Sequence, residues 1–138
     1  MAGLIYLDAC LLIYLIENDR LRAPAILAAM SAASAGETPH GFAVSPLVKM
    51  ECLVKPMKSA DFVLQARYEE SLSLFVQLPM PEAVFLQAAK LRASFALKTA
   101  DAMHLACAQH HHCVALWTND NRLAQAGHGL AVSIVQPA

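Results

Sequence analysis

Four of the eleven acidic residues stand at positions where a carboxylate is either costly or useful, namely Asp8, Glu51, Asp101 and Asp120. If the fold brings these side chains together, they will repel one another strongly unless a cation neutralises them. Oxygen ligands select hard cations such as Mg²⁺ or Mn²⁺. Such a cation can generate a nucleophilic water and stabilise the charge that develops on a phosphoryl group. The four residues therefore indicate metal-dependent hydrolysis of phosphodiester bonds.

Asp8 and Asp120 each come shortly after a predicted strand. Asp8 directly follows the apolar run of residues 4–7, and Asp120 follows residues 114–117 with two polar residues between. Ligands of open parallel sheets bind beyond the carboxyl ends of the strands, so both aspartates are expected at that edge. The alternative is that each aspartate only caps the helix that follows it.

Glu51 lies in a helix that the Ser-Pro pair at residues 45–46 starts, with a capping hydroxyl followed by proline at the first helical position. This helix is predicted to run from residue 46 to about residue 54 and to end before Pro56. Its apolar stripe consists of Leu47, Met50 and Val54. Glu51 fills the i+4 position of the same stripe, which predicts an inward carboxylate that must be paired or metal-bound. The alternative is a boundary glutamate that reaches solvent.

Asp101 is predicted in the first turn of a helix over residues 99–110 that Thr99 caps. The helix dipole alone favours a carboxylate there, which is the alternative explanation. Leu105 and Ala108, four and seven residues further on, are expected to face the core, so Asp101 shares the inward face. His104, three residues after Asp101, is expected to be a polar residue at the boundary of the core.

Short apolar runs alternate with helical patterns along the chain. The predicted strands are residues 4–7, 42–44, 75–78, 114–117 and 131–135. The predicted helices cover residues 11–16, 24–35, 46–54, 60–74, a segment that begins at Pro81, residues 99–110 and a short segment from residue 121. This alternation predicts the α/β class, with a parallel sheet packed between helices.

The four acidic segments, taken together, resemble the motifs of PIN domains. The opening of the family is similar to LIYLDA at residues 4–9 followed by LIYLIE at 12–17, and its glutamate segment is similar to SPLVKMEC at 45–52. Its third and fourth acidic motifs are similar to TADAMHLA at 99–106 and to TND at 118–120 with Leu123. The resemblance implies a PIN-like three-layer α/β/α sandwich with a short central parallel sheet, and a single PIN domain over residues 1–138.

The same resemblance implies an endoribonuclease that depends on Mg²⁺ or Mn²⁺. Its catalytic and metal-binding residues would be Asp8, Glu51, Asp101 and Asp120. Thr118 would form a hydrogen bond within the site, and Asn119 would support the fourth carboxylate. Lys98 and Arg122, which flank acidic motifs, are candidates for contacts with RNA phosphates.

Single-domain PIN proteins of this size are mostly VapC-type toxins, which implies a VapB-like antitoxin and a homodimer as partners. The composition agrees with burial by a partner, since 57% of the residues are hydrophobic and 15% are charged, against about 25% charged in an average soluble domain. Residues 11–16 and the helices that begin near Pro24 and Ala60 are expected to form a dimer face or an antitoxin groove.

Charge and cysteine usage argue against several other classes of protein. The net charge of −1 is unlike that of a general RNA coat protein. The apolar N-terminus lacks a basic leader, and no run of 18 apolar residues exists, so we expect no secretion signal and no membrane span. The four cysteines are scattered without a CxxC motif, so we expect reduced thiols in a cytoplasmic protein.

Two other functions stay open. Cys10 stands where the family usually has Asn, Ser or Thr, and a thiol is a poor hydrogen-bond donor. This substitution favours a catalytically weak or inactive PIN-fold module that binds RNA or protein. A third candidate function is that of a phosphatase or DNA nuclease on a similar α/β scaffold, because fold alone does not decide chemistry.

Overall fold

Strand β1 (Leu4–Leu7) lies at the centre of a parallel sheet with the order β3-β2-β1-β4-β5. The computed structural model describes residues 3–119, 123, 126 and 129–134. The other strands are β2 (Gly41–Val44), β3 (Val76–Gln77), β4 (Ala115–Thr118) and β5 (Ala131–Ser133). Ile5, Tyr6 and Leu7 are all buried, so β1 is covered on both faces, as a continuous apolar run requires.

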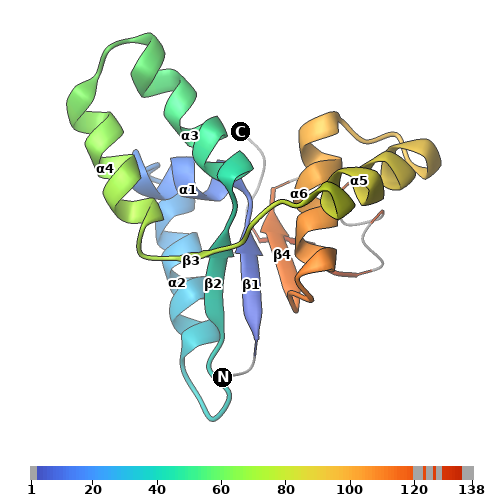
Figure 1. The fold of residues 1–138 in the computed structure, drawn as a ribbon. Helices are drawn as coiled ribbons and strands as arrows, with labels where there is room; N and C mark the ends of the chain where they lie inside the picture. The colour runs from blue at the N-terminus through green and yellow to red at the C-terminus, as the bar shows by residue number, and fades with distance from the viewer. Residues whose placement is uncertain (1–2, 120–122, 124–125, 127–128, 135–138) are drawn as a thin grey trace.

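Pairs of helices connect the strands and cover the two faces of the sheet. The chain passes from β1 to β2 through α1 (Ala9–Ile16) and α2 (Arg22–Ser34), and from β2 to β3 through α3 (Pro46–Lys58) and α4 (Phe62–Leu72). It returns to β4 through α5 (Glu82–Ser94) and α6 (Thr99–His110). Figure 1 shows α1 to α4 grouped on one side of the sheet and α5 and α6 on the other. The predicted α/β/α sandwich is therefore confirmed.

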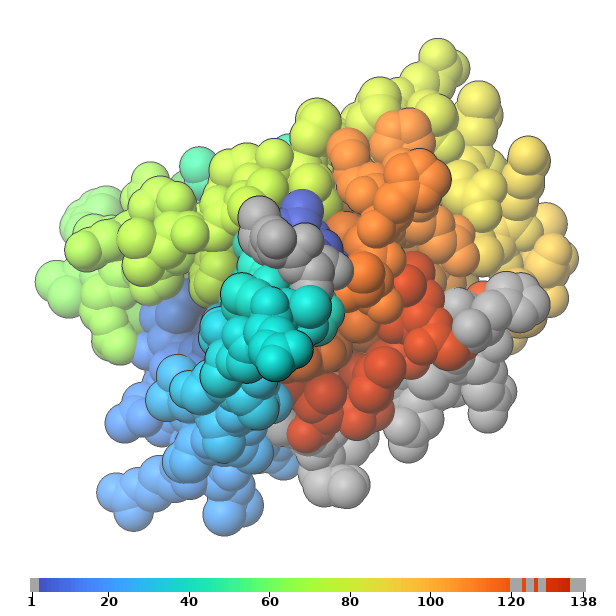
Figure 2. Space-filling model, turned by 90° about the horizontal axis from the view of Figure 1, so that it is seen from below, coloured from blue at the N-terminus to red at the C-terminus, as the bar shows by residue number. Residues whose placement is uncertain are grey.

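The order of the strands creates a crevice at one end of the sheet. From β1 the chain winds outward to β2 and β3, whereas β4 and β5 lie on the opposite side of β1. The connections that leave β1 and β4 therefore diverge at their carboxyl ends, which is where open α/β sheets bind ligands. Figure 2 looks at the other end, where the strands begin, and shows the α2–β2 connection, in cyan, across the middle of that end.

Most predicted elements are present with their ends within two residues of the prediction, but the end of α3 and the cap of α6 differ for physical reasons. Helix α3 continues through Pro56 to Lys58 instead of ending before the proline. Pro56 lies in the last turn, where it removes one backbone hydrogen bond, and its ring is buried in the core. In α6 the capping position is Lys98, so Thr99 is the first helical residue and its hydroxyl does not cap.

The described part of the chain contains no helix that is long and apolar enough to cross a membrane. The helix predicted from residue 121 lies outside the described residues, apart from Leu123 and Ala126, which are helical and buried. The predicted final strand is observed as β5.

Candidate active site

Asp8 occupies the position between the end of β1 and the start of α1. It is the N-cap residue of α1, yet its side chain makes no capping hydrogen bond. Its side chain instead accepts a 2.8 Å hydrogen bond at Oδ2 from Thr118 Oγ1, at the end of the neighbouring strand β4. Asp8 is only 8% exposed. Helix capping therefore does not account for this carboxylate, and the predicted hydrogen bond of Thr118 is present.

Glu51 reaches the same end of the sheet from α3, although not for the reason the sequence suggested. The predicted inward stripe is wrong, because Met50 and Val54 are each 56% exposed. The buried residues of α3 are Val48, Cys52, Leu53 and Pro56. Glu51 borders this buried face, and its Oε1 lies 2.5 Å from His104 Nε2.

His104 is fully buried, so the expectation of a residue at the core boundary is wrong. Its Nε2 lies 3.7 Å from Asp8 Oδ1, and its Nδ1 lies 2.7 Å from the hydroxyl of Tyr6. The sequence carries a signal for this burial, because Ala108 is one helical turn further on along the face that is expected to be inward.

A cleft of about 390 Å³ brings the predicted residues together. Its lining consists of Asp8, Ala9, Cys10, Ile13, Glu51, Lys98, Ala100, Asp101 and Asn119. Three of the four predicted carboxylates and one predicted phosphate-binding lysine therefore share one cavity. The remaining two predicted residues, Asp120 and Arg122, lie outside the described residues.

Asn119 and Cys10 line the cleft next to Asp8. The amide of Asn119 donates a 2.9 Å hydrogen bond from Nδ2 to the hydroxyl of Tyr14, which ties the end of β4 to α1. Burial and the adjacent Asp8 carboxylate raise the pKa of the Cys10 thiol far above its ordinary value. Cys10 is therefore a neutral thiol in the cleft, and within the described residues all four cysteines are free.

The carboxylates of the cleft fit a hard divalent cation. Carboxylate oxygens of Asp8 and Glu51 and a ring nitrogen of His104 all lie within 4.8 Å of one another, so one ion can bridge the two carboxylates. Asp101 adds a third carboxylate to the same cleft. Mg²⁺ and Mn²⁺ prefer such oxygen ligands, and the ion would offset the repulsion among the carboxylates.

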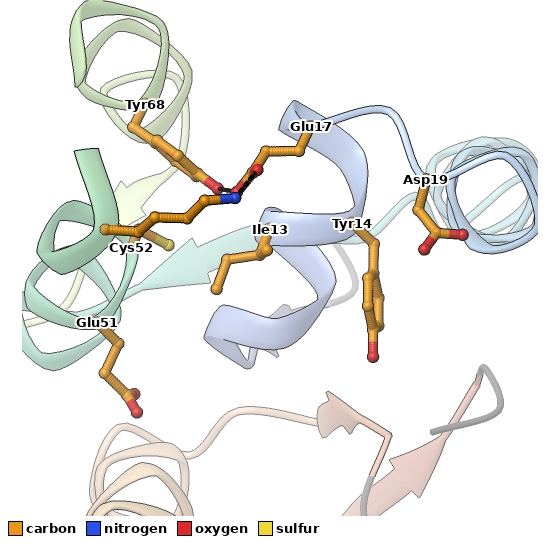
Figure 3. A pocket seen from close by; sticks show the side chains of 8 residues that line it. Ile13, Tyr14, Glu17, Asp19, Glu51, Cys52 and Tyr68 are labelled. Atoms are coloured by element: carbon orange, nitrogen blue, oxygen red, sulfur yellow. Dashed lines mark hydrogen bonds and ion pairs between the residues drawn. The ribbon is translucent and has the colours of Figure 1, made fainter. Parts of the chain in front are cut away.

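A second pocket of about 300 Å³ adjoins the acidic cleft and shares Ile13 and Glu51 with it. Figure 3 shows the carboxylate of Glu51 pointing away from a cluster at the other end of this pocket. In that cluster Glu17 accepts hydrogen bonds from Lys55, at 2.5 Å, and from Tyr68, at 2.6 Å. Partial burial opposes ionisation of Glu17, but these two hydrogen bonds outweigh it and lower the pKa of Glu17.

The chain belongs to the PIN domain family, whose model matches residues 5–129. The assignment made from the four acidic motifs is thereby confirmed, and membership of this family supports a nuclease function. No curated protein sequence matches the chain.

Solved structures with the same fold come from toxin–antitoxin systems. A toxin–antitoxin complex from Klebsiella pneumoniae matches with a TM-score of 0.76 at 26% identity, covering 96% of this chain and 99% of that chain. VapBC2 from Rickettsia felis, bound to promoter DNA, matches with a TM-score of 0.77 at 13% identity, and the match covers 94% of this chain and 97% of that chain. Mycobacterium tuberculosis VapC20, a toxin that cleaves the sarcin–ricin loop, matches with a TM-score of 0.69 at 16% identity, covering 96% and 99%. The fold is thus that of VapC-type toxins.

Proposed function

We propose that this protein is a metal-dependent endoribonuclease of the VapC type, formed by a single PIN domain over residues 1–138 and acting in the cytoplasm. The observation that carries the proposal is the convergence of Asp8, Glu51 and Asp101 in one cleft at the carboxyl ends of β1 and β4. These residues come from three different elements, so their meeting is a property of the fold and not of local sequence.

The residues of the cleft divide into three roles. Asp8, Glu51 and Asp101 would hold Mg²⁺ or Mn²⁺, and Asp120 would complete the set as the fourth motif of the family suggests. The bound cation would supply an activated water and neutralise charge at the scissile phosphate. Lys98, exposed at the rim of the cleft, would bind a phosphate oxygen of the RNA, as would Arg122.

The supporting residues fix how these carboxylates are presented. Thr118 holds one oxygen of Asp8, so the other oxygen faces the cavity between Glu51 and His104. Asn119 would position the chain that leads to Asp120, since its amide is anchored to Tyr14. Ligands that hydrogen bonds already hold in place bind a cation without the entropy cost of ordering them at the time of binding.

The decisive experiment compares purified wild type with Asp101→Asn on a panel of structured and single-stranded RNAs, in Mn²⁺, Mg²⁺ and EDTA. We expect cleavage by wild type only with metal, and loss of cleavage in Asp101→Asn. Glu69→Gln, on the exposed side of α4, is the matched control and should cleave like wild type. Absence of cleavage in every metal, by folded protein free of antitoxin, would favour the PIN-fold binding module that Cys10 suggests. Cleavage of DNA or phosphomonoesters alone would favour a DNA nuclease or a phosphatase.

We also propose an antitoxin groove between α1, α2 and α4, as the apolar patterns of these helices suggested. A groove of about 530 Å³ is lined there largely by apolar side chains, including Leu12, Leu15, Leu27, Met30 and Phe75. Such a groove fits the apolar face of an amphipathic antitoxin segment. Leu27→Glu should abolish copurification with the product of a neighbouring small reading frame, whereas Phe85→Glu on α5 should not.

A homodimer would cover a second apolar surface. Met50, Val54 and Met57 lie on the outer side of α3 and are each more than half exposed. Exposed clusters of this kind mark protein interfaces more often than free surface. Val54→Glu should therefore convert a dimer into a monomer in analytical ultracentrifugation, and a monomeric wild type would rule out the dimer.

A further inference from the structure

A chain of buried hydrogen bonds runs through the protein interior and ends at Glu51. Ser45 Oγ lies 2.6 Å from the Tyr6 hydroxyl, which lies 2.7 Å from His104 Nδ1, and His104 Nε2 lies 2.5 Å from Glu51 Oε1. Ser45, Tyr6 and His104 are fully buried. They come from the end of β2, from β1 and from α6, so the chain joins the sheet to both helix layers.

The direction of these hydrogen bonds follows from their two ends. The carboxylate oxygen of Glu51 accepts, so His104 Nε2 donates to it. A ring whose hydrogen is on Nε2 accepts at Nδ1, so the Tyr6 hydroxyl donates to that nitrogen. Ser45 then donates to the Tyr6 hydroxyl and accepts from the backbone N–H of Val48. The hydroxyl hydrogens of Ser45 and Tyr6 therefore both have acceptors.

Both ring nitrogens of His104 are engaged by neighbouring side chains, Nε2 by Glu51 and Nδ1 by the Tyr6 hydroxyl. Neither nitrogen is therefore free for a cation, even though Nε2 lies within 4 Å of Asp8 and Glu51. His104 thus contacts a ligand without being one.

We propose that Tyr6 and His104 are positioning residues for Glu51: their buried chain holds this carboxylate facing Asp8, where the cation binds. Glu51 needs such support because its side chain is about one-third exposed and has three rotatable bonds, whereas His104 and Tyr6 are fully buried. Outer residues that orient a metal ligand contribute roughly 10- to 100-fold to metal affinity. The inference rests on the proposed function, since it assigns a role toward the same cation.

The test is a matched pair of single-oxygen deletions, Tyr6→Phe and Tyr68→Phe. Both tyrosines are buried, and both hydroxyls lie on a path to a glutamate, but Tyr68 donates to Glu17 on the other side of the second pocket. Mn²⁺ affinity is measured by isothermal titration calorimetry and folding by urea denaturation. We expect Tyr6→Phe to weaken Mn²⁺ binding about tenfold and Tyr68→Phe to leave it unchanged, although both lose stability.

Two further variants separate positioning from a structural contribution. His104→Gln keeps an N–H that can reach Glu51 and should retain more Mn²⁺ affinity than His104→Ala. Nitrogen-15 NMR of the imidazole should show a protonated Nε2 and an unprotonated Nδ1 at His104 in wild type, and a changed ratio of tautomers in Tyr6→Phe. A purely structural role would lower stability without altering Mn²⁺ affinity, even where the ratio of tautomers changes.

The outcomes distinguish this inference from the function on which it rests. If wild type binds no Mn²⁺, or if Glu51→Gln binds as tightly as wild type, the proposed metal site itself is wrong. If Glu51→Gln weakens binding while Tyr6→Phe and His104→Ala do not, the metal site stands and the positioning role is overturned. Should Tyr6→Phe fail to fold, the comparison of His104→Gln with His104→Ala decides the question.

Discussion

Thr118 and Asp8, 110 positions apart in the sequence, are joined by a hydrogen bond of 2.8 Å that links the ends of β4 and β1. The bond uses Asp8 Oδ2, whereas Asp8 Oδ1 faces His104 Nε2 at 3.7 Å. The backbone N–H of Asp8 also donates to the carbonyl of Trp117, so the position of Asp8 is fixed from two sides. A carboxylate at the junction of two strands thus has one oxygen engaged and one directed toward the cleft.

Replacing Thr118 by valine should show what this bond contributes. Valine keeps the shape of the buried side chain but removes the donor, so the Asp8 carboxylate loses a hydrogen bond at a buried position. Such a loss costs about 1.5–3 kcal/mol of unfolding free energy for a charged acceptor. We expect urea denaturation to show this loss, together with weaker Mn²⁺ binding by calorimetry. Thr118→Ser keeps the hydroxyl and should recover most of both properties; equal effects of the two substitutions would argue against the bond.

Lys98 should contribute to RNA affinity but not to sequence specificity. It is exposed at the rim of the acidic cleft, where it can approach a phosphate. Removing one phosphate contact to single-stranded RNA lowers the salt dependence of log K by roughly 0.7. Fluorescence anisotropy of labelled RNA, measured across a salt series with Asp101→Asn as the background, should detect this change in Lys98→Ala. Lys90→Ala on α5 is the control, and identical salt slopes for both variants would remove Lys98 from the RNA site.

The ion pair of Glu17 should make stability fall in acid. The pKa of Glu17 is lowered because the hydrogen bonds from Lys55 and Tyr68 outweigh its partial burial. A lowered pKa in the folded state means that the stabilisation is present above the ordinary pKa of 4.5 and is lost as the pH falls through the folded value. Since Lys55 is largely exposed, the effect should be below about 1 kcal/mol.

The measurement is the difference in unfolding free energy between wild type and Glu17→Gln from pH 7 down to pH 3. This difference should be largest near neutrality and should shrink in acid, while Glu69→Gln should show no such trend. A difference that is constant with pH would mean that the charge of Glu17 is irrelevant to its contribution.

The sequence predicted the position of Asp8 because a local pattern, the apolar run before it, specifies that position. A continuous apolar run of four residues is typical of a strand buried on both faces, so the aspartate after it had to lie at the sheet edge. The hydrogen bond of Thr118 within the site was implied by the resemblance to PIN domains, and its acceptor is Asp8. The structure confirms both positions.

The face of α3 could not be read from the sequence because this helix has apolar residues on more than one side. Val48 and Cys52 are buried, whereas Met50 and Val54, which are also apolar, are exposed. Periodicity identifies an inward face only when the opposite face is polar, and an apolar surface on both sides removes that contrast. Glu51 lines the cleft from the border of the buried face, so the inward stripe that its prediction relied on is absent.

The helical spacing indicated that His104 is buried, but nothing local indicated that it pairs with Tyr6 and Glu51. Tyr6 and His104 are 98 positions apart, and each looks in isolation like an ordinary member of a strand or helix. The pairing of buried polar groups is decided by the tertiary fold, which must supply a partner for every donor. Sequence spacing therefore located the carboxylates but could not reveal what holds them.

Gly3, directly before β1, should tolerate a side chain less well than Gly36. Its φ of 112° is a conformation that side chains avoid, and a Cβ there would lie 2.8 Å from Val114 Cγ1. Valine is stiff about χ1, so the contact is not easily relieved, and Gly3→Ala should cost about 2–4 kcal/mol of unfolding free energy. At Gly36, where φ is 91° and a Cβ would meet nothing within 4 Å, Gly36→Ala should cost only the backbone strain, about 1 kcal/mol. Adding Val114→Ala to Gly3→Ala should bring its loss down to that of Gly36→Ala in urea denaturation, and no recovery in the double variant would show that backbone conformation alone forbids a side chain at this position.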